Sequence, residues 1–173
     1  MKKIITEHLC LRKLLVSDIT RDYINSLNDL EVIRLTETKY EKWTMPKVKK
    51  YVIKSNEPGK SLLTGIFLKE TDKHIGNIRL FNFNEHHRRA ELGIMIFDKS
   101  QWSKGYGTES LGAFTKYAFE RFSLHKICAD YYSPNKASAR IFEKSGFKTE
   151  GIFKDHFLLD GKYVDSIRIA KFD

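Results

Sequence analysis

Residues 90–110, AELGIMIFDKSQWSKGYGTES, carry the pattern that decides how this chain folds. The apolar run 90–97 is typical of a buried strand, and Gly105 and Gly107 precede a segment, 108–121, with the apolar spacing of a helix. Glycine lets a ligand approach the backbone closely, and the first N–H groups of a helix have no partner inside it. The sequence therefore predicts a strand, a turn and a helix whose start binds an anion such as a diphosphate.

The segments on either side of this stretch predict a sheet with helices packed against it. Further strands are expected at 8–14, 61–68, 74–83, 126–130, 147–158 and 163–171. Helices are expected at 17–28, capped by Ser17 or Asp18, from Thr44 to about residue 55, and from Asn135 to Lys144, with Gly146 ending the last. Residues 29–43 lack a strong periodicity and are expected to form a loop. This order predicts one α+β domain over residues 1–173, with a mixed, mostly antiparallel sheet of about seven strands and about four helices.

Composition and charge limit the classes of partner. The chain has 173 residues, 41% of them hydrophobic, and a net charge of +9. These values suit a folded domain that either binds a polyphosphate ligand or has a solvated basic surface. The basic residues are scattered and form no nucleic-acid-binding motif, so neither nucleic acid nor a membrane is expected as a partner. Cys10 and Cys128 form no CxxC pair, and His86 and His87 lack metal-ligand spacing, so we expect free thiols, no metal and a cytoplasmic location.

Two common phosphate-binding motifs do not fit the glycine turn. The chain has no GxxxxGK[ST] sequence, which excludes a P-loop. A Rossmann fold needs a third glycine, where Ser110 stands, and a regular alternation of strands and helices. Three strands expected to be antiparallel precede this turn, so a different α+β architecture is expected.

Three short motifs in a fixed order resemble a known family. They are Trp102-Ser-Lys-Gly-Tyr-Gly-Thr108, Asn135-Lys-Ala-Ser138 and Glu143-Lys-Ser-Gly-Phe147, with Glu91 in the strand before them. Over the whole chain this combination resembles the GCN5-related N-acetyltransferases (GNAT), and within them the RimJ/RimL-like branch. The wider superfamily often has Gln or Arg where Trp102 stands, but tryptophan is usual in this branch. The resemblance implies the GNAT fold, in which the sheet splays in a V between the strands expected at 88–97 and 126–130.

The resemblance also implies acetyl-CoA as the cofactor and names the residues that hold it. The pyrophosphate is expected on the turn, and the pantetheine arm is expected to pair with the strand at 88–97 like an additional strand. The pyrophosphate residues would be Ser103, Lys104, Gly105, Tyr106, Gly107 and Thr108. Backbone groups of Ile94, Met95 and Ile96 and side chains of Asn135, Ser138 and Phe142 would meet the rest of the cofactor.

The implied reaction needs a proton acceptor and a proton donor. An alkylamine has a pKa near 10 and is protonated at neutral pH, so a base must remove a proton before the amine attacks the thioester. Glu91 is the leading candidate, with an ion pair to Arg88 or Arg89 as its structural alternative, and His156 is the second candidate base. Ser138, which follows Asn135 by one helical turn, is expected to protonate the departing thiolate, with Tyr131 and Tyr132 as weaker candidates.

The acceptor amine is less constrained by the sequence. Its site is expected between the early helices, the loop at 29–43 and the last hairpin, with the residues Thr36, Glu37, Tyr40, Trp43, Phe81, Phe83 and Phe157. The basic balance favours a small phosphorylated amine such as a nucleotide-linked amino sugar over a basic ribosomal protein. A polyamine would need the local acidic patch that Glu31, Glu37 and Glu41 offer. The oligomeric state stays open, with a homodimer as one expectation, and a CoA-binding sensor is the non-enzymatic alternative.

Overall fold

The computed structural model describes all residues, 1–173, and is organised around one eight-stranded sheet. The strands lie in the order β1-β2-β3-β4-β5-β6-β8-β7, and every neighbouring pair is antiparallel except β5 and β6. Their bounds are β1 Ile4–Ile5, β2 Leu9–Lys13, β3 Ser61–Leu68, β4 His74–Asn84, β5 Arg89–Ile96, β6 Lys126–Tyr132, β7 Lys148–Leu159 and β8 Lys162–Phe172. The predicted α+β class and mostly antiparallel sheet are confirmed, and the two-residue β1 is an additional strand.

Five α-helices connect these strands. They are α1 Arg21–Ser26, α2 Leu30–Ile33, α3 Met45–Lys54, α4 Tyr106–Phe122 and α5 Lys136–Lys144, with short 3-10 turns η1 Val16–Asp18, η2 Glu37–Tyr40 and η3 Lys99–Gln101. The prediction of a loop at 29–43 is wrong, since α2 and η2 lie within it. The predicted cap of the first helix is also wrong. Asp18 accepts the Leu15 N–H at 2.7 Å within η1, and Thr20 caps α1.

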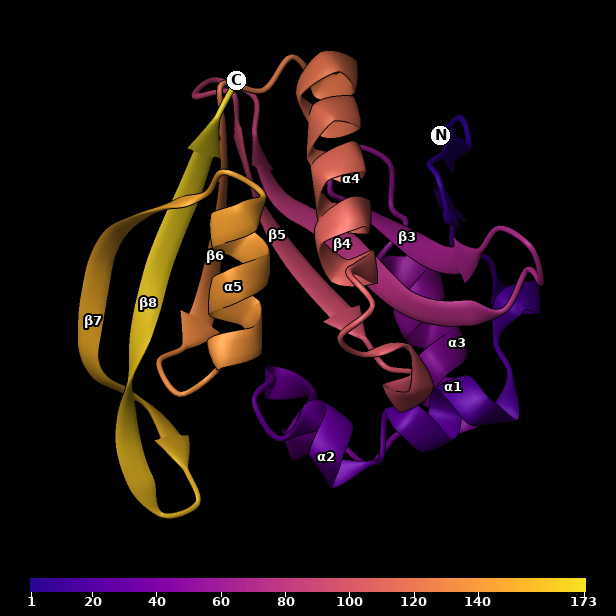
Figure 1. Cartoon of the computed structure of the whole chain (residues 1–173), viewed down its shortest axis with the longest axis horizontal. Helices are drawn as coiled ribbons and strands as arrows, with labels where there is room; N and C mark the ends of the chain where they lie inside the picture. The colour runs from indigo at the N-terminus through magenta and orange to yellow at the C-terminus, as the bar shows by residue number, and fades with distance from the viewer.

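The sheet opens between its two parallel neighbours. β5 and β6 pair only at Arg89–Lys126, Ala90–Ile127 and Glu91–Cys128, after which each strand continues without the other. β5 remains paired with β4 through Ile96, and β6 remains paired with β8 through Tyr132. Figure 1 shows β5 and β6 diverging toward their arrowheads, with α2 beneath the open end. The predicted V between these two strands is therefore confirmed.

Each face of the sheet carries its own hydrophobic core. On one face, Leu111, Phe114 and Ala118 of α4 belong to a cluster of 18 buried residues that includes Ala90 and Leu92 of β5. The other face has a cluster of 11 buried residues, to which α1, α2 and α3 contribute. Because side chains alternate along a strand, Glu91 points away from α4, toward the face of α1–α3. None of the helices has both the length and the apolar character needed to cross a membrane.

Candidate functional site

The turn before α4 leaves a run of backbone N–H groups without acceptors. None of the N–H groups of residues 103–108 donates a hydrogen bond within the molecule, and Glu109 N is the first to reach back, to Gly105 O at 3.0 Å. Ser103 and Gly105 have positive φ angles of 63° and 86°, which turn the chain into the helix. Consecutive free donors at the positive end of a helix dipole fit an anionic diphosphate.

The two glycines of this turn serve different purposes. Gly105 adopts the left-handed conformation, and open space surrounds the position of its missing Cβ. Gly107 is buried, and a Cβ there would lie 2.7 Å from Cδ1 of Ile141 in α5. The absence of a side chain at Gly107 thus allows α4 to pack against α5, and the expected approach of a phosphate to both glycines stays a prediction.

Trp102 explains how the turn is placed beside β5. Its indole Nε1–H donates to the carbonyl of Ile96, the last residue of β5, at 2.8 Å. This bond closes the loop between the strand and α4, so the free N–H groups lie at the end of the open strand. The tryptophan thus has a structural role at the position where the wider family often has Gln or Arg.

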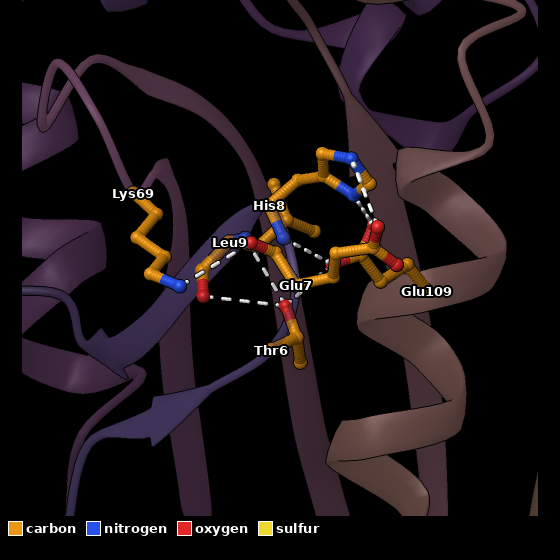
Figure 2. A network of polar contacts seen from close by, with 6 residues as sticks. All are labelled: Thr6, Glu7, His8, Leu9, Lys69 and Glu109. Carbon is orange, nitrogen blue, oxygen red and sulfur yellow. Dashed lines mark hydrogen bonds and ion pairs between the residues drawn. The ribbon is translucent and has the colours of Figure 1, made fainter.

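A polar network anchors the first turn of α4 to the N-terminal segment. Figure 2 shows Thr6 and His8 converging on Glu109. One carboxylate oxygen accepts the Thr6 hydroxyl at 2.6 Å and the His8 N–H at 2.9 Å, and the other lies 3.0 Å from His8 Nδ1. Burial opposes ionisation of the carboxyl, but the hydrogen bonds from Thr6 and His8 prevail and lower the pKa of Glu109. No sequence signal identified this network, because its members are about a hundred residues apart.

The free edge of β5 fits an extended ligand. Ile94, Met95 and Ile96 pair with β4 on one side and have no strand on the other. Gly93 is exposed, and nothing lies within 4 Å of the position its Cβ would take. No bulge occurs at Gly93, since the register shift of β4 and β5 lies between Phe81 and Asn84. An unpaired edge with open space beside it is suited to pairing with a chain of amide groups.

Asn135 begins α5 on the far side of the opening. Its side-chain oxygen accepts the Ser138 N–H at 3.0 Å, which confirms the predicted cap. The Ser138 hydroxyl is half-buried and makes no hydrogen bond within the molecule. Phe142 is only 4% exposed and packs between Tyr131 and Phe147, so it belongs to the core. Its expected contact with the cofactor stays a prediction.

Glu91 lies where the sheet begins to open. It stands on the last rung that joins β5 to β6, opposite Cys128. Its carboxylate accepts from Asn82 Nδ2 at 3.1 Å and from Arg168 at 3.3 Å, and Arg168 also pairs with Asp130. The ion pair with Arg88 or Arg89, considered from the sequence, does not form. Glu91 thus has a fixed orientation on the face opposite α4.

His156 lies apart from Glu91. It is an exposed residue of β7, the outermost strand, in a segment where the register with β8 shifts between Phe153 and Phe157. Its ring contacts Phe153 and Phe157, with centroids 5.5 and 4.9 Å away. Two strands, β6 and β8, lie between β7 and β5 in the sheet, so the structure does not place the two candidate bases side by side.

Several predicted acceptor residues meet at the open end of β6. The ring of Tyr132 stacks on Phe157 with centroids 4.1 Å apart, and its hydroxyl donates to Glu37. Tyr40 donates to the carbonyl of Leu158 at 3.1 Å. Burial, followed by the hydrogen bond to Glu37, raises the pKa of Tyr132. The structure therefore brings together three predicted acceptor residues, Glu37, Tyr40 and Phe157. Tyr132 joins them, although the sequence suggested it only as a proton donor.

The remaining predicted acceptor residues are placed differently. Phe81 pairs with Glu91 across β4 and β5, but Trp43 packs against Tyr51 at 5.5 Å. The hydroxyl of Thr36 donates to Ile33 O at 2.8 Å. Phe83 packs on Phe122 and lines a hollow of about 550 Å³ that also includes Met1, Arg88 and Tyr117. This places Phe83 at the closed end of β5, because it follows the bulge in β4.

The predicted acidic patch is largely neutralised. Glu31 pairs with Lys99 at 2.8 Å, and Glu41 pairs with Lys47 at 2.5 Å. Glu37 has the Tyr132 hydroxyl as its partner. Of these three carboxylates, only Glu37 therefore lacks a cation partner.

Comparison with known proteins identifies the family of this chain. A family model described as an acetyltransferase (GNAT) domain matches residues 8–148. The uncharacterized N-acetyltransferase YoaA of Bacillus subtilis is 31% identical over 102 residues, 59% of this chain and 57% of that protein. Spermidine N(1)-acetyltransferase of Escherichia coli K12 is 32% identical over 107 residues, 61% and 57% of the two chains. The [ribosomal protein uS5]-alanine N-acetyltransferase of the same strain is 37% identical over 79 residues, 46% and 40%.

The aligned stretches span about half the length of these curated relatives, whereas likeness to solved structures extends over almost the whole chain. The spermidine N-acetyltransferase from Vibrio cholerae, in complex with CoA and spermine, superposes with a TM-score of 0.84 at 23% identity, covering 96% of each chain. A RimL ribosomal-protein acetyltransferase in complex with CoA gives a TM-score of 0.87 at 19% identity, covering 99% of this chain and 98% of the other. These two superpositions show the same fold.

Proposed function

The chain belongs to the GNAT acetyltransferase family, and from this premise we propose that it transfers an acetyl group from acetyl-CoA to a primary amine. The observation that carries the proposal is the continuous path from the free N–H groups of residues 103–108, along the open edge of β5, to Glu91. The turn would hold the pyrophosphate, and Ile94, Met95 and Ile96 would pair with the pantetheine. When bound, the cofactor supplies an acetyl thioester as the electrophile.

The protein's own residues then supply the proton transfers. Glu91 accepts a proton from the acceptor ammonium, directly or through one water molecule, which leaves a neutral amine as the nucleophile. Asn82 and Arg168 hold the Glu91 carboxylate in one orientation. The hydroxyl of Ser138, which has no acceptor within the molecule, donates its proton to the departing thiolate and regains one, directly or through water, from the nitrogen as the amide forms. His156 remains the second candidate base, and its distance from Glu91 makes it the weaker one.

For the acceptor, we infer a small cationic amine of the polyamine class. The face that carries Glu91 also carries Asp130, Glu37 and the stacked rings of Tyr132 and Phe157. Carboxylates and aromatic rings are the groups that bind alkylammonium ions. The nucleotide-linked amino sugar favoured by the net charge has less support, because the three carboxylates of Glu91, Asp130 and Glu37 outnumber the two cations beside them, Arg168 and Lys39. The relative that acetylates the alanine of a ribosomal protein makes a protein N-terminus the second candidate.

An assay of CoA release by the purified protein tests this function. The acceptors are spermidine, a short peptide with an N-terminal alanine, and a nucleotide-linked amino sugar, each with acetyl-CoA. We expect the highest kcat/KM for spermidine. Turnover confined to the peptide or the sugar would overturn the acceptor class, and CoA binding in a calorimeter without turnover of any amine would favour the sensor.

We also propose a homodimer that covers the exposed apolar side chains of the last hairpin. Ile152 and Phe153 of β7 are each 51% exposed, and Tyr163 of β8 is 66% exposed. Apolar side chains grouped on a sheet edge are typical of a contact between protein chains. Light scattering of the native protein and of Phe153→Ser gives the test, with a shift to the monomer mass expected for the variant.

A further inference from the structure

The side chain of Lys39 occupies a site that suits a primary ammonium ion. Its Nζ lies 4.7 Å from the ring centroid of Tyr132 and 5.0 Å from that of Tyr40. It also donates to the carbonyl of Arg34 at 3.2 Å, and no ion pair joins it to a carboxylate. Two aromatic faces and a carbonyl oxygen are a known way to bind an alkylammonium group. We call these three groups, from Tyr132, Tyr40 and Arg34, the ammonium subsite.

Residues 34–40 hold the subsite beside the end of β6, on one side of the opening. Arg34 Nε donates to Asp160 at 2.9 Å, Tyr40 donates to Leu158, and Glu37 accepts the Tyr132 hydroxyl. These contacts join the segment after α2 to β6 and to the β7–β8 hairpin. α2, just before this segment, lies beneath the open end of the V in Figure 1. The subsite therefore has a defined position relative to β6.

That position lies on the same face as Glu91 and at a definite distance from it. Cys128, which pairs with Glu91, and Tyr132 are separated by four residues of β6 and point to the same face. Four residues of strand span roughly 13 Å. Asp130, between them, shares Arg168 with Glu91. An extended molecule with one amine at Glu91 thus places a group about 10–15 Å away on Tyr132.

We propose that the ammonium subsite binds the far ammonium group of a di- or polyamine acceptor, and that Lys39 occupies it as an internal competitor in the free protein. The inference rests on the proposed acetyl transfer at Glu91. Lys39 has the same chemistry as the end of such a substrate, a primary ammonium on an alkyl chain. The incoming amine displaces Lys39, which is only half-buried, so that its flexible side chain can return the ammonium to water.

The test compares Lys39→Met with Lys42→Met. Methionine keeps an unbranched side chain at position 39 but removes the ammonium, and Lys42 is an exposed neighbour that makes no hydrogen bond or ion pair. KM and kcat are measured for n-butylamine, which cannot reach from Glu91 to Tyr132, for spermidine, and for α,ω-diamines of increasing length. In Lys39→Met, the KM of spermidine and the long diamines is expected to fall about two- to five-fold, the range set by one partly exposed cation–π contact.

The same variant is expected to leave the KM of n-butylamine and of acetyl-CoA unchanged, and Lys42→Met should match the native protein throughout. An equal change for short and long amines, no change for either, or a higher KM for spermidine would overturn the role of Lys39. If the native protein acetylates none of these amines, the proposed polyamine class of acceptor fails instead, and with it the subsite. Calorimetric titration of spermidine into the CoA-loaded protein gives an independent readout, with tighter binding expected for Lys39→Met only.

Discussion

The two faces of the sheet beside the opening between β5 and β6 are built in different ways. On the face of α4, the proposed binding groups are backbone N–H groups of consecutive residues, 103–108. On the face of α1–α3, the proposed groups are side chains from distant segments, among them Glu37, Glu91 and Tyr132. A backbone site depends on the conformation of one turn, whereas a side-chain site depends on the identity of each residue. The first site is therefore expected to tolerate substitutions that the second does not.

The hydrophobic cores on these two faces also differ in their polar content. The core under α4 consists of hydrophobic residues. The core under α1–α3 adjoins a buried polar chain, in which Tyr23 accepts from Asn77 Nδ2 at 2.9 Å and His74 Nε2 lies 2.9 Å from Asn77 Oδ1. His74 Nδ1 is buried without a partner. His74 is thus a titratable group next to the core under α1–α3. The pH dependence of stability can therefore distinguish that core from the core under α4.

The largest expected effect distinguishes a side-chain site from a backbone site. Glu91→Gln should lower kcat by about 10²–10⁴-fold, the usual contribution of a general base. Ser103→Asn, which suits the positive φ at that position, should keep kcat within about two-fold because the ligand meets the backbone there. If Glu91→Gln keeps full activity and the native pH profile, Glu91 is not the base, and its role is limited to the ion pair with Arg168.

The second prediction concerns the pH dependence of stability through His74. Burial lowers the pKa of His74 to about 4, from an ordinary value of 6.5. Below pH 6.5, His74 binds a proton in the unfolded chain but stays neutral in the folded protein. The free energy of unfolding therefore falls as the pH drops toward 4, by up to about 3 kcal/mol. Urea unfolding of the native protein and of His74→Gln at pH 7 and 4.5 measures this. If the free energy of unfolding falls equally between pH 7 and 4.5 in the native protein and in His74→Gln, another group causes the acid sensitivity.

A smaller effect is expected where a side chain supports the backbone site. Glu109→Ala leaves the Thr6 hydroxyl and the His8 N–H without their acceptor, and should weaken CoA binding by about ten-fold through displacement of the first turn of α4. The KM of the amine should stay unchanged. Glu120→Ala, an exposed position of the same helix, is the matched control. Calorimetry with CoA gives the affinities, and native affinity in Glu109→Ala would show that the turn holds its conformation alone.

The smallest expected effect compares two glycines of α4. Gly112 has nothing within 4 Å of its missing Cβ, so Gly112→Ala should stabilise the helix by about 0.5–1 kcal/mol. Gly107→Ala should bring no gain, because the new methyl group would lie 2.7 Å from Ile141. Melting temperatures of the two variants measure the difference, and an equal rise in both would show that α5 moves aside freely.

Much of the fold follows from local signals in the sequence. The strand at 89–96, the cap at Asn135 and the helix end at Gly146, with its φ of 83°, each depend on residues within a few positions. Thr20, and neither Ser17 nor Asp18, caps α1, because Asp18 forms an ion pair with Arg12 of β2. The short elements α2 and η2 carry too few residues to show a period, so tertiary contacts decide them.

The sequence by itself determined the family and the strand-turn-helix unit with its glycine turn, because these depend on neighbouring residues and backbone conformation. Only the tertiary structure decided which side chains gather around Tyr132. Thr6 and Glu109 are 103 positions apart, and Tyr132 and Glu37 are 95 apart. Contacts of this kind arise from the order of strands in the sheet and from its opening at Glu91. The spacing of residues in the sequence does not predict the order of the strands in the sheet.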